Sequence, residues 1–142
     1  MNKKTFYTLS FTWGIILTIL GCIVTAIFLI TGHKPKKWGH AWYFEVKENS
    51  AWSGLNLGPM FIATENASEH TKNHELGHGL QNCKYGLLTP FIVHIPSCIR
   101  LWYREFKYHR RGLTPPTKYD DAWFEGEATT LGTEFMNLYN TK

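Results

Sequence analysis

Cysteine is scarce in this chain of 142 residues, which contains only Cys22, Cys83 and Cys98. Cys22 lies in the apolar N-terminal run, so two cysteines remain for the rest of the chain. Cys83 or Cys98 could bind metal, but small buried thiols are the favoured interpretation. Two cysteines do not form a disulfide framework, and a reducing compartment suits this usage slightly better than an oxidising one.

Also missing is a stripe of arginine and lysine interleaved with aromatic residues, which an RNA-binding face would require. The formal net charge of +4 is mild, and it does not indicate a nucleic-acid partner. We expect the basic segments to face anionic lipid instead.

Charge is absent from Leu9 to Ile30, a run of 22 residues. A transmembrane helix needs about 20 predominantly apolar residues, so residues 1–32 are predicted to form a single-pass membrane anchor, followed by a linker at 33–40. A cleaved signal peptide would have a shorter apolar core and a small-x-small cleavage site, and the sequence has neither. Positive charge after the run slightly exceeds that before it, which favours a cytoplasmic position for the rest of the chain.

Residues 41–142 are predicted to form one domain of mixed α and β structure (α+β). Ala41–Lys47 is rich in aromatic and β-prone residues, which is typical of a strand, and Glu48–Ser50 is typical of a turn. Leu55–Thr64 predicts a second strand, interrupted at Gly58-Pro59, where proline indicates a sheet edge or a bulge. An edge strand at this place could pair with an extended peptide, and an ordinary hairpin that covers the next helix is the alternative.

A second apolar stretch covers residues 85–103, and Pro90, His94 and Pro96 interrupt it. The prolines argue against a straight membrane span. Aromatic residues and then arginines and lysines follow the apolar ones, an order typical of a segment at the membrane interface. A buried connection inside the domain core is the alternative.

The most informative stretch is His74-Glu75-Leu76-Gly77-His78, which fits the pattern H-E-x-x-H. Residues four apart lie on the same face of a helix, so both imidazoles can reach one ion, and the glutamate lies beside it. The pattern predicts a zinc site with His74 and His78 as ligands and Glu75 as the general base that acts on water.

Two helices are predicted in the domain. The first contains the motif, starts at a cap supplied by Asn66 or Ser68 and ends near Asn82. The last runs from about Tyr119 to Asn140, and its apolar positions recur at helical spacing: Phe124, Ala128, Leu131, Phe135 and Leu138.

A catalytic zinc site needs a third protein ligand. The residues that could supply it are Asp120, Asp121, Glu125, Glu127, His70, His94 and His109. Glu125 and Glu127 both border the apolar stripe of the last helix, so periodicity alone does not choose between them. Asp121 lies one turn before Glu125 and could accept a hydrogen bond from a ligating imidazole, which favours Glu125 and leaves Glu127 as the alternative ligand.

The TKNHELGHGL run and the later Glu125-Gly126-Glu127-Ala128 resemble gluzincin zinc peptidases, in which a glutamate on a later helix is the third ligand. Thr129 stands where membrane-associated gluzincins usually have aspartate. The resemblance implies a minimal zincin-like domain, in which a short sheet or hairpin packs on the motif helix and a C-terminal ligand helix. It also implies Zn²⁺ as cofactor and a tyrosine or histidine that stabilises an oxyanion, for which Tyr119, His109 and Tyr103 are candidates.

We therefore expect a membrane-anchored zinc metallopeptidase that cleaves a peptide or protein, and a site near the bilayer suits membrane-proximal segments. Two other functions fit the same sequence. One is a zinc-binding membrane sensor or protein-interaction module that does not catalyse, and the other is a membrane-anchored structural protein in which the motif is coincidental.

Overall fold

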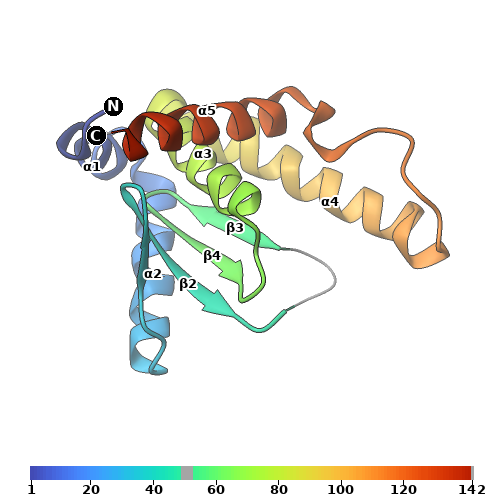
Figure 1. The fold of residues 1–142 in the computed structure, drawn as a ribbon, viewed down its shortest axis with the longest axis horizontal. Helices are drawn as coiled ribbons and strands as arrows, with labels where there is room; N and C mark the ends of the chain where they lie inside the picture. Colours follow the sequence, from blue (N-terminus) through green and yellow to red (C-terminus); the bar gives the residue numbers. More distant parts are fainter. Residues whose placement is uncertain (49–52, 142) are drawn as a thin grey trace.

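The computed structural model describes residues 1–48 and 53–141, which have the predicted α+β composition (Figure 1). The strands are β1 (Lys36–Trp38), β2 (Ala41–Val46), β3 (Gly54–Leu57) and β4 (Met60–Thr64). The α-helices are α1 (Lys3–Phe11), α2 (Ile15–Ile30), α3 (Glu69–Tyr85), α4 (Ile95–Lys107) and α5 (Trp123–Asn140). Short helical turns are η1 (Gly86–Leu88), η2 (Pro90–His94), η3 (His109–Arg111) and η4 (Tyr119–Asp121), of which η2 is a π-helical turn.

The strands form one mixed sheet in the order β1-β2-β4-β3. β2 and β4 are parallel, and β1 and β3 pair antiparallel with them at opposite edges. The predicted interruption at Gly58-Pro59 is the tight turn between β3 and β4, where Gly58 takes a positive φ of 75° that favours glycine. β3 is therefore an edge strand of this sheet and also one arm of a hairpin. The turn predicted at Glu48–Ser50 lies, apart from Glu48, outside the described residues.

The motif helix α3 packs on β3 and β4 (Figure 1). Ser68 caps its start, because the Ser68 side chain accepts a hydrogen bond from the backbone N–H of Thr71 at 3.1 Å. The helix ends at Tyr85, slightly beyond the predicted end, where Gly86 takes a φ of 58°. Glu69 in the first turn and Lys84 in the last turn both suit the helix dipole.

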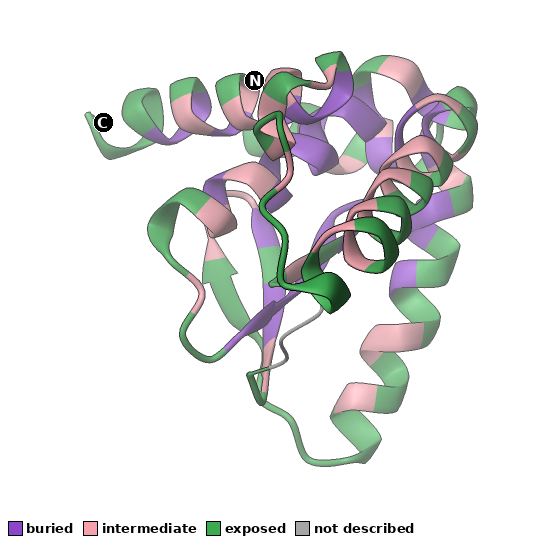
Figure 2. Cartoon of the chain, turned by 90° about the vertical axis from the view of Figure 1, so that its right-hand side faces the viewer, coloured by how far each residue is buried: buried purple, intermediate pink, exposed green. Residues whose placement is uncertain are grey.

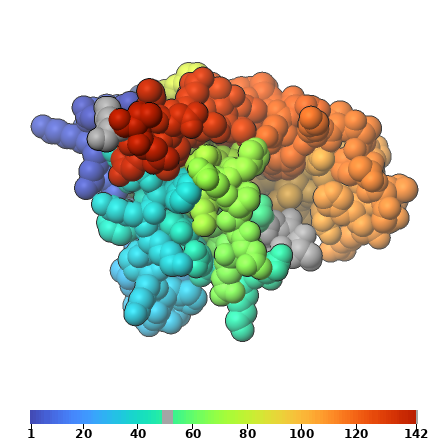
Figure 3. Space-filling view, viewed as in Figure 1, coloured from blue at the N-terminus to red at the C-terminus, as the bar shows by residue number. Residues whose placement is uncertain are grey.

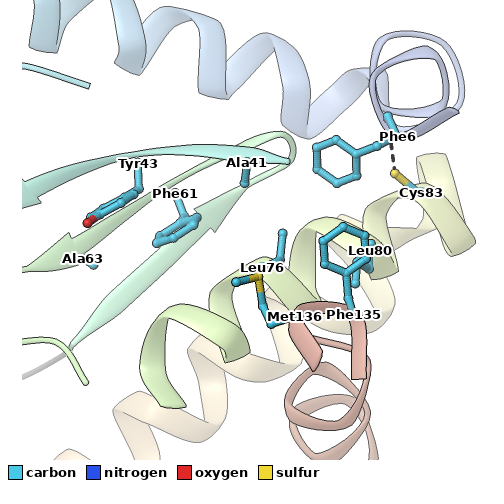
Figure 4. Close-up of a cluster of buried hydrophobic side chains, with 10 residues drawn as sticks. All are labelled: Phe6, Ala41, Tyr43, Phe61, Ala63, Leu76, Leu80, Cys83, Phe135 and Met136. Carbon is cyan, nitrogen blue, oxygen red and sulfur yellow. Dashed lines mark hydrogen bonds between the residues drawn. The ribbon is translucent and has the colours of Figure 1, made fainter. Parts of the chain in front are cut away.

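The hydrophobic core lies between the sheet, α1, α3 and α5 (Figure 4). The rings of Tyr43 and Phe61, on β2 and β4, stack with their centroids 5.1 Å apart. Leu76 and Leu80 line the side of α3 that faces them, and Phe6 of α1 is fully buried in the same cluster.

The apolar stripe predicted on α5 is confirmed over its first part. Phe124, Ala128 and Phe135 are buried, whereas Leu138 is 68% exposed. The prediction for Leu138 is wrong because the last turn of α5 extends past the core, and its residues are exposed near the C-terminus in Figure 2. Met136 is buried instead.

α3 and α5 pack so closely that their backbones touch. A Cβ on Gly77 would lie 1.8 Å from the carbonyl oxygen of Ala128, and a Cβ on Gly132 would lie 1.7 Å from that of Asn73. Glycine costs about 1 kcal/mol against alanine in a helix interior, so neither position favours the helix itself. The two glycines allow the backbones of α3 and α5 to touch, and this close packing brings the start of α5 beside the motif.

The N-terminal run does not form the predicted single helix. α1 ends at Phe11, α2 begins at Ile15, and the two axes are bent by 97°. Within the described ranges no single helix has both the length and the apolar composition needed to cross a membrane, and α1 and α2 meet these criteria only together, as a bent pair.

Contacts with α3 explain the bend. The side-chain amide of Asn82 donates to the carbonyl of Gly14 at 3.1 Å, and a Cβ on Gly14 would lie 2.2 Å from that amide nitrogen. Across the bend, the Thr18 hydroxyl donates to the Ser10 carbonyl at 2.6 Å. Tertiary contacts thus divide a run that is continuous in hydropathy.

Residues 33–40, predicted to be a linker, include β1, whose Lys36 binds Glu45 at 2.6 Å. In residues 85–103 the chain passes through η1 and η2 into α4, which projects with the segment after it from the body (orange in Figure 3). Phe91 is 62% exposed and Ile99 63% exposed, so this stretch is not a connection buried in the core.

Alanine at Gly77 or Gly132 is expected to force α3 and α5 apart. Overpacking typically costs 1–3 kcal/mol, and a methyl group against a backbone carbonyl belongs at the upper end, which outweighs the gain of about 1 kcal/mol in helix propensity. We expect each variant to lower the free energy of unfolding by about 2 kcal/mol in chemical denaturation with a chelator present. Thr130→Ala, on the exposed face of α5, should change it by less than about 0.5 kcal/mol. Wild-type stability of both glycine variants would contradict the backbone contact.

Candidate metal centre

Two helices bring three ligand-type side chains to one point. His74 and His78 lie one turn apart on α3, and Glu125 lies in the first turn of α5. The two Nε2 atoms are 3.1 Å apart, and they lie 3.1 and 3.3 Å from Oε2 of Glu125. Donors bound tetrahedrally to zinc at 2.0–2.2 Å are about 3.4 Å from one another, so the three atoms fit one zinc ion.

The surroundings of Glu125 also fit a cation. Glu125 is fully buried, and among the described residues neither of its carboxylate oxygens has a hydrogen-bond donor. A buried carboxylate without a partner is costly, and a zinc ion shared with the two imidazoles would balance its charge.

The hydrogen bond at Nδ1 of His74 determines which ring nitrogen carries the proton, and so which one can bind an ion between His74, His78 and Glu125. The Thr129 hydroxyl donates its proton to Oδ2 of Asp120 at 3.1 Å, and its oxygen lies 2.8 Å from Nδ1 of His74. The oxygen therefore accepts a proton from Nδ1, which leaves the lone pair of Nε2 for an ion. Thr129 occupies the position at which the resemblance predicts an aspartate. The carboxylate is supplied by Asp120, which acts on His74 through the hydroxyl of Thr129.

Gln81 holds His78 in the same way. Its amide nitrogen donates to the carbonyl of Phe124 and to Oε2 of Glu127, both at 2.8 Å. Its oxygen therefore accepts the proton on Nδ1 of His78, also at 2.8 Å, and Nε2 again presents a lone pair. Two lone pairs and a carboxylate oxygen that face one another at this distance repel unless a cation lies between them.

Glu127, the alternative third ligand, has other partners. Besides Gln81, its carboxylate binds the ammonium group of Lys84 at 2.5 Å and the hydroxyl of Tyr85 at 2.8 Å. Burial acts to raise its pKa, but the hydrogen bonds from Lys84, Gln81 and Tyr85 outweigh burial and lower it. The structure thus brings Glu125 to the two histidines and uses Glu127 to hold Gln81.

Glu75 lies on the wall of a cavity of about 450 Å³ that His74 and His78 also line. Gly54 of β3 lines the same cavity, and a Cβ there would lie 2.4 Å from Oε1 of Glu75, so glycine is what leaves room for the carboxyl group. Burial raises the pKa of Glu75 to about 7. A carboxyl group with this pKa can both take up and release a proton near neutral pH.

Tyr119, a predicted oxyanion donor, lies in the same cavity. Its ring centroid is 6.5 Å from that of His74, and its hydroxyl is 3.2 Å from Oγ of Ser97. Burial raises the pKa of Tyr119, and the negative charge of Glu125 raises it further, so the phenol keeps its proton. It can therefore donate a hydrogen bond into the cavity.

The other two predicted residues have different surroundings. His109 lines the cavity from its exposed position after α4, with Nδ1 at 3.3 Å from Glu105. Asp121 accepts a hydrogen bond from the backbone N–H of Lys118 at 2.8 Å. The role expected of Asp121, as partner of a ligating imidazole, falls to Thr129 instead.

Two further histidines border the cavity without joining the three ligands. Nε2 of His70 lies 3.7 Å from Oδ2 of Asp120 on the exposed side. Nε2 of His94 lies 3.2 Å from the carbonyl oxygen of Asn56. Burial, followed by the nearby His78, lowers the pKa of His94 to about 4, so this ring is neutral.

Gln81 and Thr129, which hold the two imidazoles, are positioning residues that the motif itself does not predict. Their spacing carried the signal, because Gln81 follows His78 by three positions and Thr129 follows Glu125 by four. Each therefore lies on the same helical face as a ligand.

Comparisons with protein-family models, with curated proteins and with solved structures found no match to this chain. The function proposed below therefore rests on the geometry of the site and on its motif.

The chain is expected to bind one zinc ion, and Glu125→Gln should remove it. Loss of a residue that only orients a ligand costs about 10–100-fold in metal affinity, so loss of a ligand charge should cost more than about 100-fold. Glu127→Gln is the matched control, which keeps an acceptor for Gln81 and should cost less than about tenfold. Elemental analysis and competition with a fluorescent chelator measure both variants. Equal losses in the two would contradict the assignment of Glu125.

Thr129→Val is expected to weaken zinc binding by about tenfold or more, because valine keeps the shape of threonine but cannot accept the proton of His74. Thr129→Ser keeps the hydroxyl and should restore most of the affinity. The same chelator competition separates them. Similar affinity of the valine and serine variants would show that the hydroxyl does not position His74.

Proposed function

We propose that this chain is a zinc-dependent metallopeptidase of the gluzincin type with a minimal zincin-like fold. The observation that carries the proposal is the convergence of His74, His78 and Glu125 at one point, with Glu75 on the wall of the adjoining cavity. Structural zinc sites have four protein ligands, whereas catalytic sites have three and one open position. The ligand group found among the described residues has three members, which favours catalysis over a purely structural site.

In this mechanism Glu75 is the general base. Zinc held by the three ligands would supply a Lewis acid that polarises the substrate carbonyl. Glu75 takes a proton from water as the water oxygen bonds to the carbonyl carbon, and it delivers this proton to the leaving nitrogen as the C–N bond breaks. Tyr119 is the residue we assign to donate a hydrogen bond to the oxyanion.

The edge strand β3 supports a peptide as the substrate. The carbonyl of Ser53, just before β3, points toward the neighbouring strand β4 and accepts a hydrogen bond from the backbone N–H of Thr64. The carbonyl of Asn56 points to the opposite side of β3 and accepts a hydrogen bond from the His94 ring. Backbone groups alternate in direction along a strand, so those of Gly54 also point away from β4, toward the cavity. An extended peptide could pair with β3 at this edge and so cross the cavity beside Glu75.

Glu75→Gln is expected to keep zinc and to abolish hydrolysis. Glutamine has nearly the same volume but cannot take up a proton, and the loss of general-base catalysis costs about 10²–10⁴-fold. The measurements are zinc content and the cleavage of a mixed peptide library, followed by mass spectrometry.

His70→Gln, at an exposed position that lines the same cavity, is the control and should keep both zinc and most of the activity. Hydrolysis that survives in Glu75→Gln would refute the mechanism. A zinc-loaded wild-type chain that cleaves no peptide, and that unfolds when zinc is removed, would instead identify a non-catalytic zinc-binding module.

A further inference from the structure

The outer face of the segment from η1 to α4 carries large apolar side chains that are exposed. Six residues spaced three or four positions apart form what we call the apolar row: Leu88, Phe91, Ile95, Ile99, Trp102 and Phe106. Their exposed fractions range from 48% to 63%. This spacing places side chains in a line along a helix, and an exposed apolar surface of such length marks an interaction site.

The opposite face of α4 is held against the rest of the chain. Arg100 donates to the carbonyl of Lys118 at 2.7 Å, and Arg104 donates to that of Thr117 at 2.9 Å. Ser97, on the same side, lines the cavity of the candidate metal centre. These contacts orient α4 so that the apolar row faces outward.

Positive charge gathers at the C-terminal end of the row. Lys107, Arg110 and Arg111 follow Phe106 and are exposed. The guanidinium group of Arg110 lies 4.4 Å from the centre of the Phe106 ring. Lys107 and Arg111 line a shallow groove together with Trp102 and Phe106. An apolar face with aromatic rings and cations beside it is complementary to the headgroup region of a bilayer that contains anionic lipid.

A second exposed apolar surface adjoins the row. A Cβ on Gly86 would lie 2.2 Å from Nε1 of Trp13, so the bend between α1 and α2 packs against the start of η1. Trp13 is itself 48% exposed. Exposed isoleucines continue along α2 from this point: Ile16, Ile19, Ile23, Ile27 and Ile30. Exposed apolar side chains therefore lie on both segments, and Trp13 contacts the start of η1.

We propose that the apolar row docks in the headgroup region of a bilayer containing anionic lipid, with α4 lying along the membrane surface. Because the other face of α4 lines the cavity, docking places the cavity about one helix diameter, roughly 10 Å, from the membrane. Docking does not depend on hydrolysis. Only if the proposed peptidase function holds does this position favour membrane-proximal peptide segments as substrates.

The test places a fluorescent probe on the row. Cys22→Ser and Cys98→Ser remove the two exposed thiols of the full chain and leave the buried Cys83. Ile99→Cys in this background is labelled with the polarity-sensitive dye NBD and mixed with vesicles of phosphatidylcholine and phosphatidylserine. We expect a blue shift, a severalfold rise in emission and quenching by nitroxide-labelled lipid. Leu138→Cys, 68% exposed where Ile99 is 63% exposed, is the matched control and should respond little.

Electrostatics gives a second readout. Pure phosphatidylcholine and added salt should weaken the response at position 99. Lys107→Gln should weaken vesicle binding by about fivefold, whereas Lys47→Gln, on an exposed position after β2, should leave it unchanged.

Three results would overturn the proposal. The first is vesicle binding with no response at position 99, which would mean that α2 alone attaches the chain. The second is an equal response at position 138. The third is a response without vesicles that grows with protein concentration, which would identify a second copy of the chain as the partner of the row.

Discussion

The site depends on one contact, the direct approach of the α3 and α5 backbones. Helices with ordinary side chains between them pack with their axes 8–10 Å apart. Gly77 and Gly132 remove the side chains at the two points where backbone carbonyls of the partner helix lie. The first turn of α5 then lies beside the motif, and Glu125 reaches the point at which His74 and His78 converge. Two residues that perform no chemistry thus decide whether the ligands can meet.

With the helices this close, the hydrogen bonds behind the site determine what it can hold. Thr129 and Gln81 each accept the Nδ1 proton of one histidine, and a carboxylate, Asp120 or Glu127, supports each of them in turn. Both rings therefore present lone pairs to the buried carboxylate, an arrangement that a cation completes. Asp120 and Glu127 do not contact the imidazoles themselves but act through Thr129 and Gln81. They therefore orient the rings, and Glu125 remains, among the described residues, the one carboxylate in direct contact with both of them.

The outer surface poses a different physical problem, because much of its apolar area lies outside the core. Phe6 of α1 is buried in the core beside α3, and Asn82 of α3 binds the carbonyl of Gly14 at the bend. These contacts attach the N-terminal helices to α3, but the isoleucines of α2 stay exposed. Trp13 joins this surface to the start of the apolar row. A membrane surface beside α4 would cover such area at low cost and would leave the cavity side of α4 free for the site.

Local spacing in the sequence determined the motif helix and its two histidine positions, since residues four apart share a helical face. It limited the cap to Asn66 or Ser68, and the structure shows that Ser68 bonds to the first turn. It did not decide between Glu125 and Glu127, because that choice depends on how α5 is rotated against α3. Nor did it show the bend at Gly14, which is bound by a residue 68 positions away. A pattern within one element reports what its own backbone does. Which elements meet, and how closely, depends on packing across the whole chain, and only the tertiary structure decided it.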